Sequence, residues 1–138
     1  MAKRKLAGLR VLVTGASQGI GRALAASAAK RGCKVLAAAR SQPLLDELAK
    51  EVRAAGGTIE TVAADVTSPA DRQAMVDAAQ KHFGGLDVLI NNAGIGATGH
   101  FMDSDPAVLR QIFEVNYFGL CEVTRAFIPI LKQGTTPA

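Results

Sequence analysis

The sequence predicts an α/β fold, a doubly wound, Rossmann-like parallel sheet with helices on both of its faces. Short apolar segments alternate with longer amphipathic ones along the chain, the order expected of repeated strand–helix units. The short segments are apolar at consecutive positions, as in strands buried on both faces, and glycines end several segments. Because strand–helix–strand crossovers are right-handed, we expect the strands in the spatial order 3-2-1-4.

The first predicted unit holds a strand over Leu9–Thr14, ended by Gly15, and a helix over Ile20–Arg31. Gly32 follows this helix, as a helix stop should. Apolar residues at i, i+4 and i+8 predict that one face of the helix packs on the sheet. The side chains expected on this face are Ile20, Leu24 and Ala28.

Two further units follow. The second joins a strand over Lys34–Ala39 to a helix over Gln42–Ala55, and the third begins with a strand over Thr58–Ala63. The third helix is expected to start at Pro69, with Ser68 as its cap. The apolar residues expected to face the sheet are Leu44, Leu45, Leu48 and Val52 in the second helix and Met75, Val76, Ala79 and Phe83 in the third.

The last unit begins with a strand over Asp87–Asn91 and continues through a loop over Gly94–His100. A helical region is expected from Asp105 to about Lys132, and Pro129 should end or bend its last turn. The fold is therefore expected to stop after the fourth strand and the helix that follows it, so that residues 1–138 form a single, incomplete domain. The apolar face of this last helical region is predicted to hold Val108, Ile112, Val115, Val123, Phe127 and Ile130.

Composition and charge argue against several classes of protein. Hydrophobic residues make up 49% of the chain, which argues against a disordered protein, and no apolar run approaches the roughly 20 residues that span a bilayer. The net charge of +4 comes partly from the basic start, which we interpret as a solvated tail rather than a nucleic-acid arm, because no binding motif accompanies it. Cys33 and Cys121 lack metal or redox spacing, so we expect free thiols, no metal site and a cytoplasmic location.

A glycine-rich turn connects the first predicted strand to its helix. It runs from Thr14 through Gly15, Gly19 and Gly21, in the pattern Gly-x-x-x-Gly-x-Gly. Glycines at such a turn permit a tight bend, a close approach of backbone to phosphate, and close packing of helix on strand. The free N–H groups at the helix N-terminus would receive a pyrophosphate. The turn therefore predicts a dinucleotide site.

This sequence resembles the short-chain dehydrogenase/reductase family from Leu9 to about Leu131. The glycine pattern differs from the Gly-x-Gly-x-x-Gly of ordinary dinucleotide folds and is similar to that family's motif. Asn91–Gly94, with the sequence Asn-Asn-Ala-Gly, resembles the family's signature after the fourth strand. Asp65, followed by Val66, and Asn116 match two further family positions. The resemblance implies a nicotinamide-dependent oxidoreductase.

The resemblance also implies which residues would contact that cofactor. Asp65 would hydrogen-bond the adenine amino group, with Val66 beside the ring, and Val115 would approach the adenine side of the pocket. Asn116 would hold a water in the catalytic proton relay. The residues around the pyrophosphate and the adenosine ribose would be Gly15, Ser17, Gln18, Gly19, Ile20 and Gly21, and those lining the ribose and the path to the nicotinamide would be Asn92, Ala93 and Gly94.

Arg40 decides between the two nicotinamide cofactors. An acidic residue at the end of the second strand would bind the ribose 2′-hydroxyl and repel a 2′-phosphate. Here that strand is followed by Arg40 and Ser41, and no acid occurs before Asp46. A guanidinium suits a phosphate through charge-assisted hydrogen bonds. We therefore expect NADP(H) to be preferred over NAD(H), with Arg40 and Ser41 as the contacts.

The chemistry that the resemblance implies needs residues that this sequence lacks. The family uses a tyrosine whose pKa is lowered by a lysine four residues later. The single tyrosine here is Tyr117, and Cys121 stands four residues after it. The intact enzyme would transfer hydride between the nicotinamide and a small carbonyl or alcohol substrate, whereas this chain alone is expected to be inactive. The alternative is a non-catalytic NAD(P)-binding or regulatory module.

The sequence also predicts that the chain associates with a second copy of itself. With no later strand in the sequence, Val88–Ile90 would be an apolar sheet edge that invites pairing with another chain. The resemblance also implies that the last helix contributes to a dimer interface. We therefore expect a homo-oligomer with no nucleic-acid or membrane partner.

Overall fold

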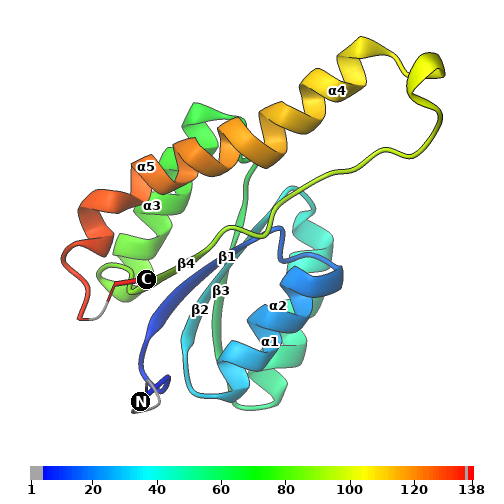
Figure 1. Cartoon of the computed structure of the whole chain (residues 1–138). Coiled ribbons are helices and arrows are strands. Elements are labelled where there is room, and N and C mark those ends of the chain that lie inside the picture. The colour runs from blue at the N-terminus through cyan, green and yellow to red at the C-terminus, as the bar shows by residue number, and fades with distance from the viewer. Residues whose placement is uncertain (1–4, 136) are drawn as a thin grey trace.

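The computed structural model describes residues 5–135 and 137–138, and within them a parallel sheet forms the centre of the molecule (Figure 1). Its strands lie in the order β3-β2-β1-β4, which confirms the predicted fold class and strand order. Part of the basic start, Met1–Arg4, lies outside the described residues. The strands are β1 (Arg10–Thr14), β2 (Lys34–Ala39), β3 (Thr58–Ala63) and β4 (Val88–Ile90).

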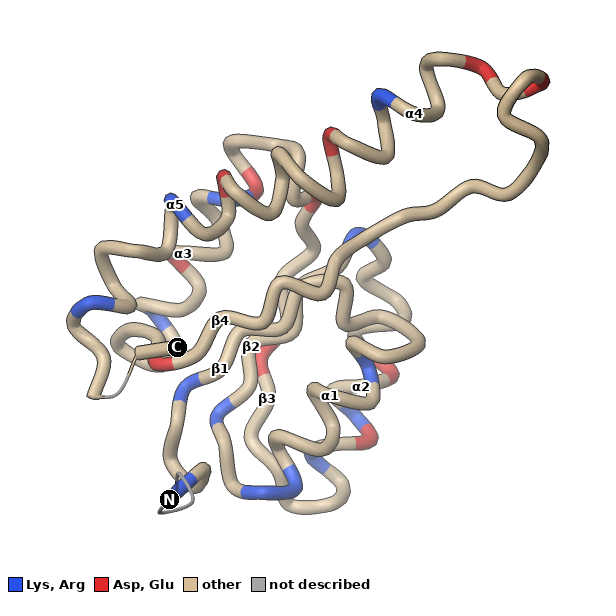
Figure 2. Tube along the Cα trace, viewed as in Figure 1, with Lys and Arg blue, Asp and Glu red and all other residues tan. Residues whose placement is uncertain are grey.

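Both faces of the central strands are buried because apolar side chains point alternately to each face. Val11 and Val13 of β1 join the core on one face, and Leu12 between them joins the core on the other. Val11 pairs with Val35 of β2 and with Val88 of β4 in parallel register. Charged residues lie mainly on helix surfaces, in loops and toward strand ends (Figure 2), so the centre of the sheet is apolar.

Helices cover the two faces in pairs (Figure 1). α1 (Gly19–Lys30) and α2 (Gln42–Ala54) pack on the face that holds Val11 and Val13. α3 (Pro69–Phe83) and α5 (Leu120–Leu131) pack on the other, where Phe127 and Met75 are fully buried. This division is the doubly wound arrangement that right-handed crossovers produce.

The prediction for the buried face of α1 was wrong by one residue. Gly21, Ala25 and Ala29 face the sheet, whereas Ile20 is 75% exposed and Leu24 is 39% exposed. Small side chains face inward because α1 lies very close to β1, and a larger face would hold the helix away. Hydrophobicity alone favoured the bulkier face, which here is turned outward.

The start of α3 agrees with the sequence. Ser68 accepts a hydrogen bond from the backbone N–H of Asp71 (3.2 Å), and Pro69 occupies the first helical position. Gly84 ends the helix in the left-handed conformation, with φ of 69°, where glycine is favoured. These local signals therefore fix both ends of the helix.

The last helical region is divided where a continuous helix was expected. A short 3₁₀ turn, η1 (Phe101–Asp103), precedes α4 (Pro106–Phe113), and a π-helical turn, η2 (Glu114–Gly119), joins α4 to α5. Asp105 caps α4 by accepting a hydrogen bond from the N–H of Ala107 (2.8 Å). α5 continues two residues beyond Pro129 before it ends at Leu131.

Residues 94–118, which we call the arm, extend beyond the sheet and its helices (Figure 1). Val108 is 37% exposed and Ile112 is only partly buried, so the predicted buried face does not extend into α4. The reason is geometric, because α4 contacts mainly the η2 turn that continues it and no sheet lies opposite. Val123, Phe127 and Ile130 of α5 are buried as predicted.

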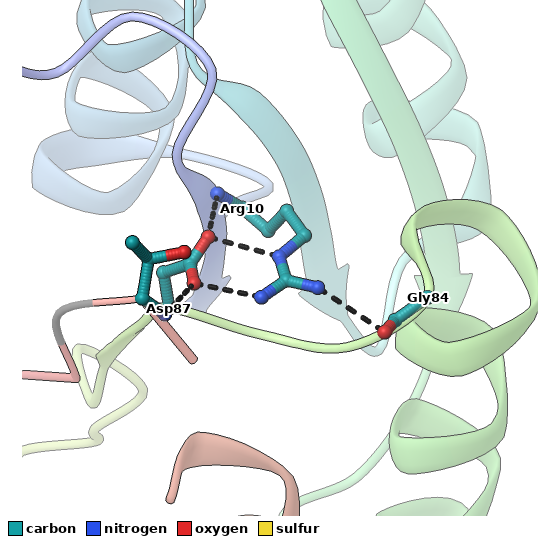
Figure 3. Close-up of polar contacts among 4 residues, drawn as sticks. Arg10, Gly84 and Asp87 are labelled. Carbon is teal, nitrogen blue, oxygen red and sulfur yellow. Dashed lines mark hydrogen bonds and ion pairs between the residues drawn. The ribbon is translucent and has the colours of Figure 1, made fainter. Parts of the chain in front are cut away.

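An ion pair that the sequence did not reveal, between a partly exposed arginine and a buried carboxylate, joins β1 to the segment before β4 (Figure 3). Arg10 donates from Nε to Oδ2 of Asp87 (2.9 Å) and from Nη2 to Oδ1 (2.7 Å), and its Nη1 binds the carbonyl of Gly84 (3.1 Å). The Asp87 carboxylate also accepts from the backbone N–H groups of Arg10 and Thr135. The side-chain hydrogen bond from Arg10 is the main reason that the pKa of Asp87 lies well below its usual range.

The edge of β4 is partly covered, contrary to the expectation of a bare edge. Ala138 donates to the carbonyl of Asp87 (3.0 Å) and accepts from the N–H of Leu89 (2.9 Å), the pattern of a parallel bridge. The expected polar tail, Gly134–Ala138, is thus tied to β4 at its last residue, while Thr136 lies outside the described residues.

Candidate functional site

A cavity of about 470 Å³ opens at the carboxyl ends of the strands, the position at which open α/β sheets bind ligands. Its volume lies within the range of small-molecule and cofactor sites. All fourteen residues predicted to contact the cofactor line it. The lining residues are Gly15, Ser17, Gln18, Gly19, Ile20, Gly21, Ala38, Ala39, Arg40, Ser41, Leu44, Ala64, Asp65, Val66, Asn92, Ala93, Gly94, Ile95 and Val115.

The floor of the cavity is the glycine turn between β1 and α1. Gly15 and Gly19 have φ of 67° and 57°, a conformation that other residues rarely adopt. A Cβ atom at Gly21 would lie 2.3 Å from the carbonyl oxygen of Gly15 and 2.4 Å from Nδ2 of Asn92. A side chain at this position would therefore separate α1 from the turn.

The N-terminus of α1 points its free N–H groups toward the cavity. Gln18 is the N-cap residue and makes no side-chain capping hydrogen bond, so the donors of the first turn stay available. A Cβ atom at Gly19 would meet nothing within 4 Å, which shows that the space beside the turn is open. This arrangement suits an anionic group such as a phosphate.

Thr14 joins the glycine turn to the segment after β4. Its Oγ1 accepts hydrogen bonds from the backbone N–H groups of Asn92 (3.1 Å) and Ala93 (3.0 Å). In turn, the side-chain Nδ2 of Asn92 donates to the carbonyls of Thr14 (3.0 Å) and Gly15 (3.3 Å). Asn91, the preceding residue, donates from its side chain to Oγ1 of Thr124 in α5 (2.9 Å).

Charged groups of both signs line the cavity. Arg40 follows β2 and is exposed, and Asp65 follows β3. The N–H of Thr67 is the main cause that lowers the pKa of Asp65, and the positive charge of Arg40 adds to the effect. Asp65 is therefore an ionised acceptor near a guanidinium at neutral pH.

Asn116 is close to the cavity but is not among its lining residues. Its Oδ1 accepts from the N–H of Ile95 (2.8 Å) and its Nδ2 donates to the carbonyl of Ile95 (2.8 Å). The side chain thus holds the start of the arm against η2, while its role in a proton relay stays a prediction. Val115, one residue earlier, does line the cavity.

The protein-family comparison decides the family. A family model described as "short chain dehydrogenase" matches residues 10–136.

The chain belongs to the short-chain dehydrogenase family.

Relatives and solved structures of this family cover nearly the whole chain. Ketoacyl reductase HetN from Nostoc sp. is 38% identical over 128 residues, which are 93% of this chain and 45% of the relative. L-sorbose reductase from Gluconobacter frateurii, solved with NADPH and L-sorbose, superposes with a TM-score of 0.86 at 30% identity and covers 92% of this chain. A Burkholderia phymatum short-chain dehydrogenase/reductase solved with NAD has a TM-score of 0.88 at 36% identity and covers 94% of this chain.

This short-chain dehydrogenase chain spans about half the length of the proteins that it matches, 45% of HetN and 49% and 46% of the two solved chains. The similarity establishes the Rossmann-like fold. It also supports a nicotinamide cofactor, since one neighbour holds NADPH and the other holds NAD. The glycine turn fits the phosphates of either cofactor, because its free N–H groups and open space face the cavity.

Several lining residues were missed by the sequence analysis. Ala38 and Ala39 end β2, where small side chains leave room, and their place before Arg40 was the signal that could have identified them. Leu44 was predicted to face the sheet yet borders the cavity, because it lies in the first turn of α2, close in sequence to Ser41. Ile95 follows the Asn-Asn-Ala-Gly segment and could have been inferred from that adjacency.

The described part of the chain offers no group of three or more metal-ligating side chains. None of its helices is long and apolar enough to cross a bilayer.

Proposed function

We propose that this chain is the cofactor-binding part, an incomplete domain, of an NADP(H)-dependent oxidoreductase acting on a small carbonyl or alcohol. One observation carries the proposal. A single cavity at the carboxyl ends of the strands brings together a glycine turn, a free helix N-terminus, a guanidinium and a carboxylate. When bound there, the nicotinamide would supply or accept the hydride.

The cavity residues divide into parts that suit different groups of the cofactor. The turn from Gly15 to Gly21 would bind the pyrophosphate through backbone N–H groups. Asp65 would accept from the adenine amino group, with Val66 beside the ring. Asn92–Gly94 would line the ribose and the path to the nicotinamide, and Val115 would approach the adenine side of the pocket.

Arg40 supports a preference for NADP(H) over NAD(H). It stands where β2 ends, beside Ser41 at the N-terminus of α2, and both residues line the cavity. A 2′-phosphate would gain a charge-assisted hydrogen bond from the guanidinium and would be favoured by the helix N-terminus. The nearest acid along α2, Asp46, is hydrogen-bonded to Gln42 (2.6 Å) on the exposed side of the helix.

Calorimetric titration with NADP⁺ and NAD⁺ tests this assignment. We expect NADP⁺ to bind about tenfold or more tightly than NAD⁺, the value of one charge-assisted hydrogen bond. Arg40→Asp should reverse the order. Arg31→Asp is the matched control, since it changes the net charge equally at an exposed position outside the cavity. An unaltered chain that prefers NAD⁺ would overturn the NADP(H) assignment, and a chain that binds neither would overturn the function.

The one tyrosine of this chain is not placed to act on a substrate in the cavity. Tyr117 is 57% exposed, does not line the cavity, and has no lysine four residues later. This observation favours a second candidate, an NADP(H)-binding or regulatory module without catalysis of its own. We expect the purified chain to show no carbonyl-dependent oxidation of NADPH, and turnover would overturn this second candidate.

The arm supports a homo-oligomer. Phe113, Tyr117 and Phe118 are each more than half exposed, and with Leu109 they give the arm an apolar surface. Such exposed aromatic surface is typical of an interface. We propose that a second copy covers it in the cytoplasm, where Cys33 and Cys121 stay reduced. Sedimentation velocity across a range of protein concentrations tests the oligomer.

A further inference from the structure

The loop between β3 and α3 brings a carboxylate to the cavity in a fixed orientation. Asp65 and Val66 of this loop line the cavity. Thr67 donates to the Asp65 side chain twice, from its backbone N–H (2.9 Å) and from its hydroxyl (2.7 Å). Both hydrogen bonds end on Oδ1. The other oxygen, Oδ2, remains able to accept from a ligand.

The backbone of the loop is held from the first turn of α3. The N–H of Asp65 donates to Oδ2 of Asp71 (2.8 Å), and Nη1 of Arg72 donates to the carbonyl of Val66 (2.9 Å). Asp71 is itself fixed, since its N–H donates to Oγ of Ser68. The loop is therefore fixed before any ligand binds. Within the described part of the chain, the Thr67 hydroxyl is the one side-chain group that hydrogen-bonds to the Asp65 carboxylate.

A carboxylate fixed in this way distinguishes donors from acceptors. A 6-aminopurine presents an N–H donor at C6, which a carboxylate oxygen accepts. A 6-oxopurine presents an acceptor there. Its oxygen would face the carboxylate oxygen, and the carboxylate oxygen would have no donor to bind. A carboxylate that rotates freely could avoid that contact, whereas one held by two donors on Oδ1 cannot.

Resting on the proposed function, we propose that Thr67 is a positioning residue that makes the cofactor site selective for a 6-aminopurine. It acts through Asp65 and touches no ligand itself. The N–H of Thr67 is also the main cause that lowers the pKa of Asp65. The lowered pKa keeps the carboxylate ionised, so that it can only accept hydrogen bonds. The Thr67 hydroxyl supplies the second hydrogen bond, and this one can be removed by substitution.

The test measures the dissociation constants of NADP⁺ and of its hypoxanthine analogue, in which oxygen replaces the 6-amino group, by calorimetry. We expect the unaltered chain to bind NADP⁺ about tenfold more tightly than the analogue. Thr67→Ala should reduce this ratio to about threefold or less, because a freed carboxylate holds the amino group less firmly and can turn away from the 6-oxygen of the analogue. Thr67→Ser keeps the hydroxyl and should restore the ratio.

Controls separate positioning from folding. Thr58→Ala removes an exposed threonine at the opposite end of β3 and should leave both dissociation constants unchanged. Circular dichroism and a thermal melt show whether each variant folds, and Thr67→Val replaces Thr67→Ala if the latter does not.

Four results overturn the inference. The unaltered chain could bind both dinucleotides equally, Thr67→Ala could keep the full ratio, it could weaken both ligands equally, or Thr67→Ser could fail to restore the ratio. In each of these cases binding of NADP⁺ by the unaltered chain leaves the proposed function standing. Failure of the unaltered chain to bind either dinucleotide overturns the proposed function and this inference together.

Discussion

The arm differs from the rest of the molecule, the sheet and its four covering helices, in what lies opposite its apolar residues. Phe127 of α5 is fully buried against the sheet, whereas Phe113 of α4 is 53% exposed, although both stand in helices of the same helical region. Helical periodicity identifies an apolar face in each case. Only the presence of a packing partner decides whether that face becomes core, and the sheet provides one for α5 but not for α4.

The largest expected effect comes from truncating one phenylalanine in each region. Phe127→Ala should lower the free energy of unfolding by about 4 kcal/mol, through lost apolar burial and the cavity left behind. At protein concentrations low enough to keep the chain monomeric, Phe113→Ala should cost less than about 1 kcal/mol, because its side chain is half exposed in the single chain. Urea unfolding followed by circular dichroism measures both. Equal losses would mean that Phe113 is covered in solution, and a dependence on protein concentration would identify the cover as a second copy.

A smaller effect is expected from the ion pair at the base of the sheet. Asp87→Asn should destabilise the fold by about 3 kcal/mol at neutral pH, because it leaves Arg10 without its buried partner. The pKa of Asp87 is lower in the folded chain than in the unfolded one. Its contribution is therefore complete above about pH 4 and declines as the pH falls toward the folded-state pKa.

Unfolding measured between pH 7 and pH 2 checks this prediction. The difference between the unaltered chain and Asp87→Asn should shrink below about pH 4. Glu122→Gln, which removes an exposed partner of Arg125 on α5, is the matched control and should change stability by less than about 0.5 kcal/mol. A difference that stays constant with pH would contradict the assignment.

The smallest expected effect compares two glycines. Gly21→Ala should destabilise the chain by about 2 kcal/mol and weaken NADP⁺ binding, because its Cβ would collide with Gly15 and Asn92. Gly96→Ala, in the arm, should change stability by less than about 0.5 kcal/mol, since a Cβ there meets nothing within 4 Å. Denaturant unfolding and calorimetry measure the two quantities. A loss at Gly96 equal to that at Gly21 would show that the arm is packed in solution.

Elements and sheet order could be predicted from the sequence because they depend on local signals. Ser68 and Pro69 start α3, and Gly84 ends it, without help from distant residues. The residues expected around the cofactor also gather in one cavity, since the carboxyl ends of parallel strands meet at one edge. Their roles in binding stay predictions.

What could not be predicted depends on contacts between distant parts of the chain. The inward face of α1 follows from how closely it approaches β1, which hydrophobicity does not encode, so Ala25 is buried and Ile20 exposed. The partner of Arg10 lies 77 residues away, and no spacing rule links the two positions. The π-helical turn η2 likewise interrupts a stretch whose periodicity reads as one helix.

The carboxylate of Asp87 also constrains the order in which the molecule can be assembled. β1 is made early during synthesis, but its neighbour on one side is β4, and the guanidinium of Arg10 finds its acceptor only after Asp87 has emerged. Thr135, which donates to the same carboxylate, emerges later still. β1 therefore gains its second neighbour only after 77 further residues have been made, and until then the nascent segment keeps one hydrogen-bonding edge of β1 open.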